Sequence, residues 1–441
     1  MRSTKTATFA ALALLLISTA GCSIFESKAK KVPLEGERIS VIAMEQQLQP
    51  DVAEEGETRT VTLPSPWKNE YWPQVGGYPN HVMQNPALGE NLSKQWDTNI
   101  GSGSRRALPL TSQPVVFDDK VFTLDTNTRV SAFDVKNGKR LWETNARPKS
   151  ERDPVIAGGL AFAGGTLFVT SGYNQVLAID PANGNIKWTG KLPSAARAAP
   201  TVLDGRVFVP TLDNRIITFA ADSGQQLWEY QGISGVSRLV KAASPAANSE
   251  IVVPVFSTGE IYALRVSNGS VAWVDNLAPA TQVGGIKSIT DISGQPVLDS
   301  GLVYAGSYGG ILAAIDERSG TRVWQREFGI SEMPWIAGDV LFALTVNKDL
   351  VALNKLTGVI YWVTTLKTPE KSKGTVTFHG PVIAGNRAIV ASSDGTVLEF
   401  DAISGKLQKH WSVGKSIRLA PIVAAGTLYI LADDGTLHAY R

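Results

Sequence analysis

The side chains that most often carry chemistry are few and scattered in this chain of 441 residues. Gly414-Lys415-Ser416 matches the end of a phosphate-binding loop, but Lys409 stands where the leading glycine belongs. No Gly-x-Ser-x-Gly nucleophile elbow occurs. The four histidines share no metal-ligand spacing with one another or with acidic clusters. They are His81, His379, His410 and His438. The sequence therefore predicts no catalytic, metal or cofactor site.

Cys22 is the only cysteine, and its position indicates lipid attachment. Met1–Lys5 is basic, Ala7–Ile17 is apolar but short, and Thr19-Ala20-Gly21 precedes the cysteine. This is a secretory signal whose end resembles a bacterial lipobox. A single cysteine cannot form an internal disulfide, whereas several acyl chains on one cysteine anchor a protein stably. Ser23, rather than Asp, implies export to the outer membrane. The alternative is an ordinary signal with an incidental cysteine.

We therefore predict a signal peptide at residues 1–21, a palmitate-bearing Cys22 and a lipidated tether at residues 22–90. Removing the signal leaves 40 basic and 40 acidic residues, so the mature chain carries no polybasic footprint for nucleic acid. The tether region has neither periodicity nor repeats. Within it, we expect Trp72–Tyr78 to be ordered and to cap the folded domain.

The dominant pattern is a turn ending in glycine, followed four positions later by tryptophan. The steps between successive tryptophans are 46, 40, 45, 51 and 38 residues. A seventh copy, at Gly405, has Lys409 in place of tryptophan. Such a period indicates an array of supersecondary units. The six complete copies are Gly138/Trp142, Gly184/Trp188, Gly224/Trp228, Gly269/Trp273, Gly320/Trp324 and Gly358/Trp362.

Each unit contains four short runs of strand-forming residues separated by turns. In the first unit the turns include Asp118-Asp119 and Asn137-Gly138, and the runs alternate apolar and polar residues. Four antiparallel strands per unit form a propeller blade, so the sequence predicts an all-β fold. We expect each repeated tryptophan to pack against the neighbouring blade. The alternative is a platform for a cofactor or sugar.

Eight copies of the second hairpin can be counted in residues 91–441. The last copy, Gly435–Tyr440, has no fourth strand after it, and Leu92–Asn99 offers one with Trp96 lying 46 residues before Trp142. We therefore predict an eight-bladed β-propeller of four-stranded antiparallel blades, closed by this N-terminal strand, which removes two open sheet edges. Seven blades is the alternative if the segment around Trp411 is not a full blade.

Two units carry a family resemblance: Val176-Leu-Ala-Ile-Asp180-Pro-Ala-Asn-Gly184-Asn-Ile-Lys-Trp188 and Leu312-Ala-Ala-Ile-Asp316-Glu-Arg-Ser-Gly320-Thr-Arg-Val-Trp324. They resemble the PQQ-like, quinoprotein-type propeller repeat, over roughly residues 92–441. A fold by itself does not imply a function. The lipobox, tether and eight blades together resemble the BamB family, and Ile286–Ala305 with Tyr308–Asp316 resembles its connection into the fifth blade.

This resemblance implies a scaffold rather than an enzyme, with no cofactor. BamB proteins are lipoproteins of the outer-membrane β-barrel assembly (BAM) complex that face the periplasm. They bind the POTRA domains of BamA, act with other BAM subunits, and assist the folding and membrane insertion of unfolded outer-membrane proteins. We expect the same function, partners and location for this chain.

The resemblance also implies where the partner binds. In the family, contacts come from the loops joining blades three to four and four to five, here Gly232–Lys241 and Pro279–Ser293. Independently, the 51-residue step ends at Trp324, so the second loop contains an insertion. Long connections on a rigid scaffold are where binding residues concentrate. The predicted contact residues are Arg238, Leu239, Val240, Lys241 and Asp291.

The match at these positions is partial. Leu239 and Asp291 match family contact residues, but the family's arginine falls on Val240 and a second contact aspartate falls on Ser293. Arg238 lies near Val240 and restores part of the charge. An inward-packing Leu239 and a turn-forming Asp291 are the structural alternatives.

Two other functions stay open. A quinone-dependent dehydrogenase shares the repeat, but such enzymes typically carry a disulfide of adjacent cysteines near the cofactor. A propeller lipoprotein could instead bind another cell-envelope ligand, such as polysaccharide.

The lipid anchor is testable at one residue. Cys22→Ser should prevent acylation, because the thiol is the attachment point, and should release the protein from the outer-membrane fraction. Labelled palmitate uptake and membrane fractionation measure both effects. A variant that still takes up label and stays in that fraction would rule out the lipobox.

Overall fold

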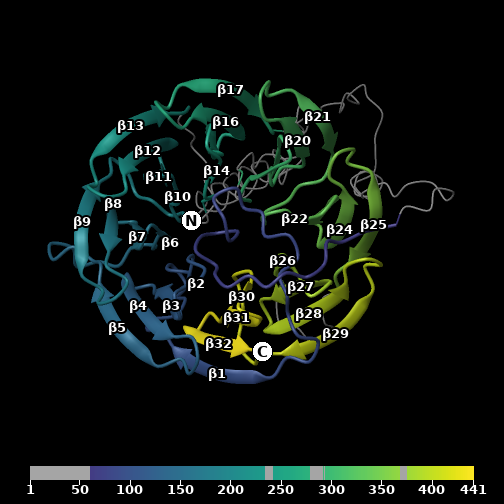
Figure 1. Ribbon diagram of the computed structural model, residues 1–441, viewed down its shortest axis with the longest axis horizontal. Helices are drawn as coiled ribbons and strands as arrows, with labels where there is room; N and C mark the ends of the chain where they lie inside the picture. Colours follow the sequence, from purple (N-terminus) through teal and green to yellow (C-terminus); the bar gives the residue numbers. More distant parts are fainter. Residues whose placement is uncertain (1–59, 234–241, 279–291, 293, 368–374) are drawn as a thin grey trace, which may run out of the picture. The chain divides into compact units, whose positions relative to one another are not determined.

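The computed structural model describes residues 60–233, 242–278, 292, 294–367 and 375–441. These residues form thirty-two strands in eight four-stranded sheets, arranged as a ring, with no helix among them (Figure 1). All of them belong to one compact unit, Leu48–Arg441. The described part of the chain thus offers no helix able to cross a membrane. The predicted all-β, eight-bladed propeller is confirmed.

Blades 1 to 4 follow one another along the chain. Their strands are β2 (Val115–Phe117), β3 (Lys120–Leu124), β4 (Arg129–Asp134) and β5 (Arg140–Asn145); β6 (Leu160–Ala163), β7 (Thr166–Ser171), β8 (Gln175–Ile179) and β9 (Ile186–Lys191); β10 (Thr201–Leu203), β11 (Arg206–Thr211), β12 (Arg215–Ala220) and β13 (Gln226–Gln231); and β14 (Ala246–Ala247), β15 (Ile251–Val253), β16 (Glu260–Arg265) and β17 (Val271–Asn276).

Blades 5 to 8 repeat the arrangement. Their strands are β18 (Val297–Asp299), β19 (Leu302–Gly306), β20 (Leu312–Asp316) and β21 (Arg322–Arg326); β22 (Trp335–Ala337), β23 (Val340–Leu344), β24 (Asp349–Asn354) and β25 (Ile360–Thr365); β26 (Phe378–Ala384), β27 (Arg387–Ser392), β28 (Thr396–Asp401) and β29 (Leu407–Ser412); and β30 (Ile422–Ala424), β31 (Thr427–Leu431), β32 (Thr436–Tyr440) and β1 (Lys94–Asn99).

The N-terminal strand closes the ring. β1 pairs antiparallel with β32, so that Trp96 lies opposite Ala439 and Asn99 opposite Thr436. In Figure 1 the first and last strands lie side by side at the lower edge of the ring. The predicted closure by Leu92–Asn99 is confirmed, and β26–β29 make the segment around Trp411 a full blade.

The repeated tryptophan and glycine meet across blade boundaries. Trp188 of blade 2 lies on Gly224 of blade 3, where an added Cβ would come within 2.6 Å of the indole. The Trp188 indole N–H donates to the Ala221 carbonyl of the same turn at 3.0 Å. Seven glycines receive an indole in this way, each with a backbone φ near +70°. They are Gly138, Gly184, Gly224, Gly269, Gly320, Gly358 and Gly405, and the predicted packing against the neighbouring blade is confirmed.

The same contact explains why the seventh copy has Lys409 rather than tryptophan. In blade 8 the outermost strand is β1, so no turn leads from β32 into a fourth strand. A tryptophan at position 409 of blade 7 would therefore have no glycine in blade 8 on which to pack. Trp411 instead donates to Glu399 Oε1 at 2.6 Å and packs on Tyr440 with ring centroids 4.6 Å apart.

The contact between an indole and its glycine can be tested with a matched pair of glycine substitutions in blade 3. Gly224 and Gly205 both have φ of +72°, but a Cβ at Gly205 meets nothing within 4 Å. Gly205→Ala should cost about 1 kcal/mol through backbone strain alone. Gly224→Ala should cost about 2–4 kcal/mol in all, because the methyl group also displaces the indole. Chemical denaturation measures the loss of unfolding free energy in both variants. Equal losses would show that the indole–glycine contact contributes little to stability.

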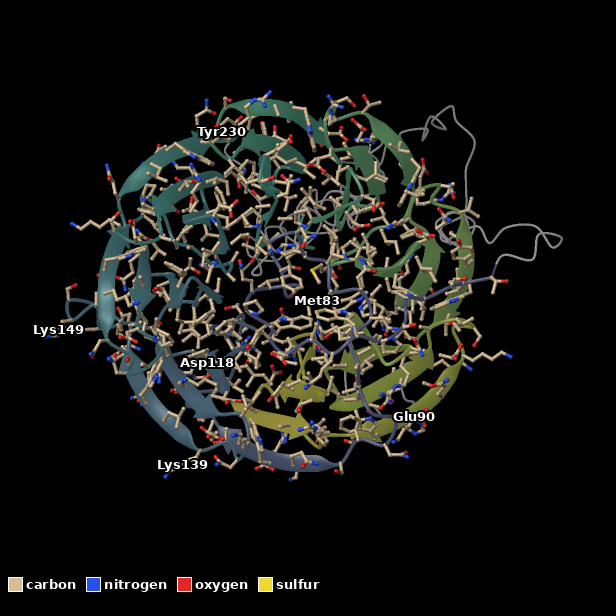
Figure 2. The ribbon with its side chains drawn as sticks, in the orientation of Figure 1. Met83, Glu90, Asp118, Lys139, Lys149 and Tyr230 are labelled. Carbon is tan, nitrogen blue, oxygen red and sulfur yellow. The ribbon has the colours of Figure 1, made fainter. Side chains whose placement is uncertain are left out.

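A cap, residues 61–88, lies over one end of the ring axis. Figure 1 shows this purple segment crossing the centre, and Figure 2 places Met83 there, while the charged Lys139, Lys149 and Glu90 lie at the periphery. Trp72 is buried and stacks on Trp335 with centroids 6.0 Å apart. The prediction that Trp72–Tyr78 is ordered and caps the ring is confirmed.

The cap bonds to every blade in turn. At each blade, a backbone N–H within the innermost strand, or in the turn after it, donates to a cap oxygen at 2.7–3.0 Å. Such pairing satisfies edge groups that would otherwise lack partners near the axis. The acceptors, from blade 8 through blades 1 to 7, are Asn69, Trp72, Pro73, Gln74, Pro79, Asn80, Gln84 and Pro86.

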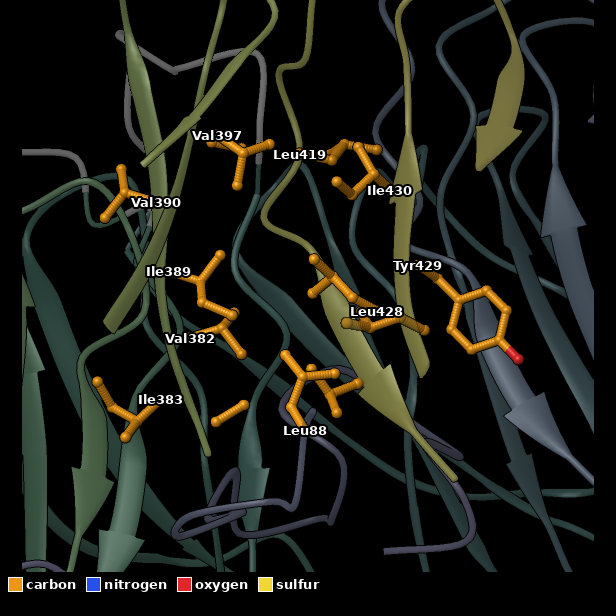
Figure 3. Packing of buried hydrophobic residues seen from close by; sticks show 14 of the residues in the cluster. Leu88, Val382, Ile383, Ile389, Val390, Val397, Leu419, Leu428, Tyr429 and Ile430 are labelled. Atoms are coloured by element: carbon orange, nitrogen blue, oxygen red, sulfur yellow. The ribbon is translucent and has the colours of Figure 1, made fainter. Parts of the chain in front are cut away.

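Side chains complete the attachment of the cap. Leu88 packs beside Val382 of β26 and Leu428 of β31, between blades 7 and 8 (Figure 3). Asn85 donates to Asn386 Oδ1 at 2.7 Å. The cap therefore adds apolar side chains to the core between blades 7 and 8, just before the chain enters β1.

His81 makes the cap sensitive to acid. Its ring is fully buried, with Nδ1 2.7 Å from the Pro296 carbonyl oxygen. Burial lowers the pKa of His81 from 6.5 to about 4, and the hydrogen bond opposes this only in part. Because the folded pKa lies below the unfolded one, its contribution to stability is complete above pH ~6.5 and is lost as the pH falls toward ~4.

This dependence can be isolated with His81→Asn, since asparagine tolerates the positive φ of this position. Between pH 7 and pH 4.5, the wild type should lose about 2.5 kcal/mol more unfolding free energy than the variant. Denaturant titrations at both pH values measure the difference. His438 and the carboxylates titrate in both proteins, so they cancel, and parallel pH profiles would contradict the prediction.

Candidate partner-binding face

The two ends of the ring axis differ. Every innermost strand ends at the cap, so the connections that lead into these strands begin at the opposite face. The turns between the second and third strands of each blade lie on that same face. We call it the open face. The connections from blade 3 to 4 and from blade 4 to 5, which contain the predicted contact residues, start and end there.

The predicted contact residues themselves lie outside the described residues. They are Arg238, Leu239, Val240, Lys241 and Asp291, and the lipidation residue Cys22 lies outside as well. Their roles stay predictions. The structure describes the ends of both loops, Ile233 and Ala242 for the first, Ala278 and Ile292 for the second.

The start of the first loop is held firmly by Asn214, from the turn between β11 and β12. The Asn214 carbonyl accepts from Gly232 N at 2.8 Å, and its Nδ2 donates to the Ile233 carbonyl at 2.6 Å. Gln231 Nε2 donates to the Gly232 carbonyl at 2.8 Å. Gly232 lies against Phe256, which leaves no room for a Cβ. The Ile233 side chain is nevertheless 61% exposed.

Aromatic rings fill the space between blades 3 and 4, next to Gly232. Tyr262 packs against Tyr230 and Phe256, with centroids 5.1 and 5.5 Å apart. Burial, with the Tyr230 hydrogen bond, raises the pKa of Tyr262, so this phenol stays protonated. The boundary between blades 3 and 4 is therefore packed with aromatic rings.

The start of the second loop is fixed by ion pairing. Arg322 donates to both Asp275 carboxylate oxygens, at 2.7 and 2.9 Å, and to the Asn276 carbonyl. Ser307 Oγ donates to the Leu277 carbonyl at 2.8 Å. Bidentate arginine–carboxylate pairs are strong and geometrically specific. Both predicted loops thus start from rigid ends.

One cavity lies on the ring axis beneath the cap. As lined by the described residues it has a volume of about 40 Å³, and polar side chains such as Gln113 and Gln295 line it beside Trp72. That volume admits only a few water molecules. Ligand pockets for drug-sized molecules are typically roughly 300–1,000 Å³.

One hydrogen-bonded chain of side chains lies between blades 6 and 7. Glu332 Oε1 is 2.9 Å from His379 Nδ1, and His379 Nε2 is 3.0 Å from Thr377 Oγ1. The half-buried pair joins the connection into β22 to strand β26. It joins two blades, and sequence reasoning missed it because Glu332 and His379 lie 47 residues apart.

The chain matches a family model described as "Outer membrane protein assembly factor BamB", in overlapping segments 90–163, 126–364 and 309–441. Together these cover all eight blades, while the cap lies before the first matched residue. BamB of Yersinia pestis is 26% identical over 79% of this chain and 88% of its own length. BamB of Salmonella typhimurium is 27% identical over 78% and 87%.

Solved structures share the fold. BamB from Moraxella catarrhalis superposes with a TM-score of 0.68 and 22% identity, over 80% of this chain and all of that one. Quinohemoprotein alcohol dehydrogenase from Comamonas testosteroni gives 0.65 and 13% identity, over 84% and 80%. At these identities the likeness concerns architecture alone, and it includes both an assembly factor and an enzyme.

Proposed function

Since the chain belongs to the BamB family of outer membrane protein assembly factors, we propose that it is a non-enzymatic scaffold of the BAM complex. In this proposal the open face binds the POTRA domains of BamA. The protein then helps present unfolded outer-membrane proteins for folding and insertion, together with other BAM subunits.

The observation that carries the proposal is the extent of the family match. It runs through all eight blades, from residue 90 to residue 441, so it includes both connections where the predicted contacts lie. The start of each connection is held by hydrogen bonds, from Asn214 for the first and Arg322 for the second. A rigid frame lowers the entropic cost of ordering a binding loop.

The location follows from the predicted anchor. We propose that acylated Cys22 holds the protein at the outer membrane, facing the periplasm, where BamA exposes its POTRA domains. The cap begins at residue 61, so the chain between Cys22 and the propeller is long enough to let the open face reach a membrane-bound partner.

The small cavity on the axis favours a scaffold over a quinone-dependent dehydrogenase. Trp72 covers one end of the axis, and the cavity beneath it, as the described residues line it, is about 40 Å³, far below the roughly 300 Å³ at which small-molecule pockets begin. The alternative of a polysaccharide ligand has no comparable support among the described residues.

The test is capture of BamA from detergent extracts of membranes by the purified lipoprotein. Leu239→Ala combined with Asp291→Ala should reduce capture severely, because an apolar anchor typically contributes about 2 kcal/mol or more. The melting curve should stay nearly unchanged, since neither substitution removes a residue of the blades.

A matched control removes the same two side-chain types elsewhere. Leu356 and Asp222 are exposed on turns between the third and fourth strands, at the cap end of their blades. Leu356→Ala with Asp222→Ala should leave capture intact. Wild-type capture by the loop variant would refute the site, and failure of the wild type to capture BamA would refute the function.

A further inference from the structure

Ile233 differs from the other exposed apolar side chains of the described residues. Most of these lie on the outermost strands, facing outward from the ring, or on turns at the cap end, and Tyr71 and Tyr78 belong to the cap itself. Ile233 is on the open face, and at 61% it is the most exposed of them. Single exposed apolar residues are ordinary on a protein surface, so its importance depends on how it is held.

The backbone around Ile233 is already bonded. Gly232 N, the Gly232 carbonyl and the Ile233 carbonyl all pair with Asn214 or Gln231. Asn214 is fixed in turn, because its Oδ1 accepts from Ser257 Oγ at 3.1 Å. A partner strand cannot add to carbonyl and amide groups that are occupied. Three of the four backbone groups of Gly232 and Ile233 are paired within the chain, which favours recognition through the Ile233 side chain.

A side chain presented in this way is suited to an anchor. Isoleucine is branched at Cβ and loses little rotamer freedom on binding, and its backbone is already ordered. The entropic cost of fixing it in an interface is therefore small. Anchors of this kind fill pockets on a folded partner and are surrounded by polar contacts that exclude water.

The neighbouring charges indicate the character of that partner. Arg215 is shared between Asp213 and Glu229, at 2.9 Å from each, and all three are partly exposed. With two carboxylates for one guanidinium, these three described residues carry a net negative charge beside Asn214. A complementary surface would carry basic side chains around its apolar pocket.

We infer that Ile233 is an anchor of the partner interface, entering an apolar recess, bordered by basic side chains, on a folded domain. This inference rests on the proposed function and adds a residue that the sequence comparison with the family did not single out. It places part of the interface on a described, rigid position at the start of the first loop.

The experiment measures binding of the full-length lipoprotein to purified BamA POTRA domains by biolayer interferometry. Ile233→Ala should raise Kd about tenfold, and Ile233→Glu should raise it further, because a carboxylate cannot enter an apolar recess without losing its hydration. The control is Ile186→Glu, an equally drastic change at an isoleucine on the outward face of β9. It should leave Kd within about twofold. Melting curves should match the wild type for all three variants.

Each outcome has a distinct meaning. If the wild type binds and Ile233→Glu binds equally well, the anchor is wrong while the proposed function stands. If Ile186→Glu weakens binding as much as Ile233→Glu, the effect is not specific to the open face and the anchor is again wrong. An association rate unchanged by salt would overturn the basic border. If the wild type does not bind at all, the proposed function fails and the anchor fails with it.

Discussion

The seating of an indole from one blade on a glycine of the next is the contact on which the ring depends. Each of the seven contacts joins a tryptophan on an outermost strand to a glycine with positive φ in the following blade. In six of them a backbone carbonyl of the same turn also accepts the indole N–H, and only Trp362 lacks such an acceptor. Trp96 makes the same contact from β1 to Gly138. The closing strand therefore does more than complete a sheet, because it also joins blade 8 to blade 1.

The cap forms a second set of contacts around the ring, closer to the axis than the indole–glycine contacts. Its backbone follows the axis end and bonds to the innermost strand of each blade, whereas the indoles join the outermost strands. A single blade offers the cap only one to three hydrogen bonds, so the cap is stable only when the blades already stand in a ring. The cap residues precede β1 directly, so closure of the ring and formation of the cap are coupled by chain continuity.

The sequence predicted the features that repeat, and of those that do not repeat it predicted only that Trp72–Tyr78 caps the ring. Hairpin turns and the tryptophan period gave the blades, their number and the closing strand, because local patterns encode them. The contact made by each indole could not be predicted from one repeat, because it joins two repeats. Gly224 packs against Trp188 of the preceding blade rather than against Trp228, which follows it in the same repeat. The cap as a whole has no period, because its hydrogen bonds go to other strands. Ile233 escaped notice because its exposure depends on Asn214, nineteen positions earlier.

The cap contacts and the indole–glycine contacts together determine which surface of the ring is left for a partner. The cap occupies the innermost strands at one end of the axis, and the indole seats occupy the turns of the outer strands at the same end. Stability therefore rests mostly on one face and on the blade boundaries. Connections on the other face carry little of it, so they can lengthen and change sequence at small cost. The 51-residue step before Trp324 falls in such a connection. The neighbouring connection, from blade 3 to blade 4, begins at Ile233, whose backbone is held by hydrogen bonds and whose side chain is exposed.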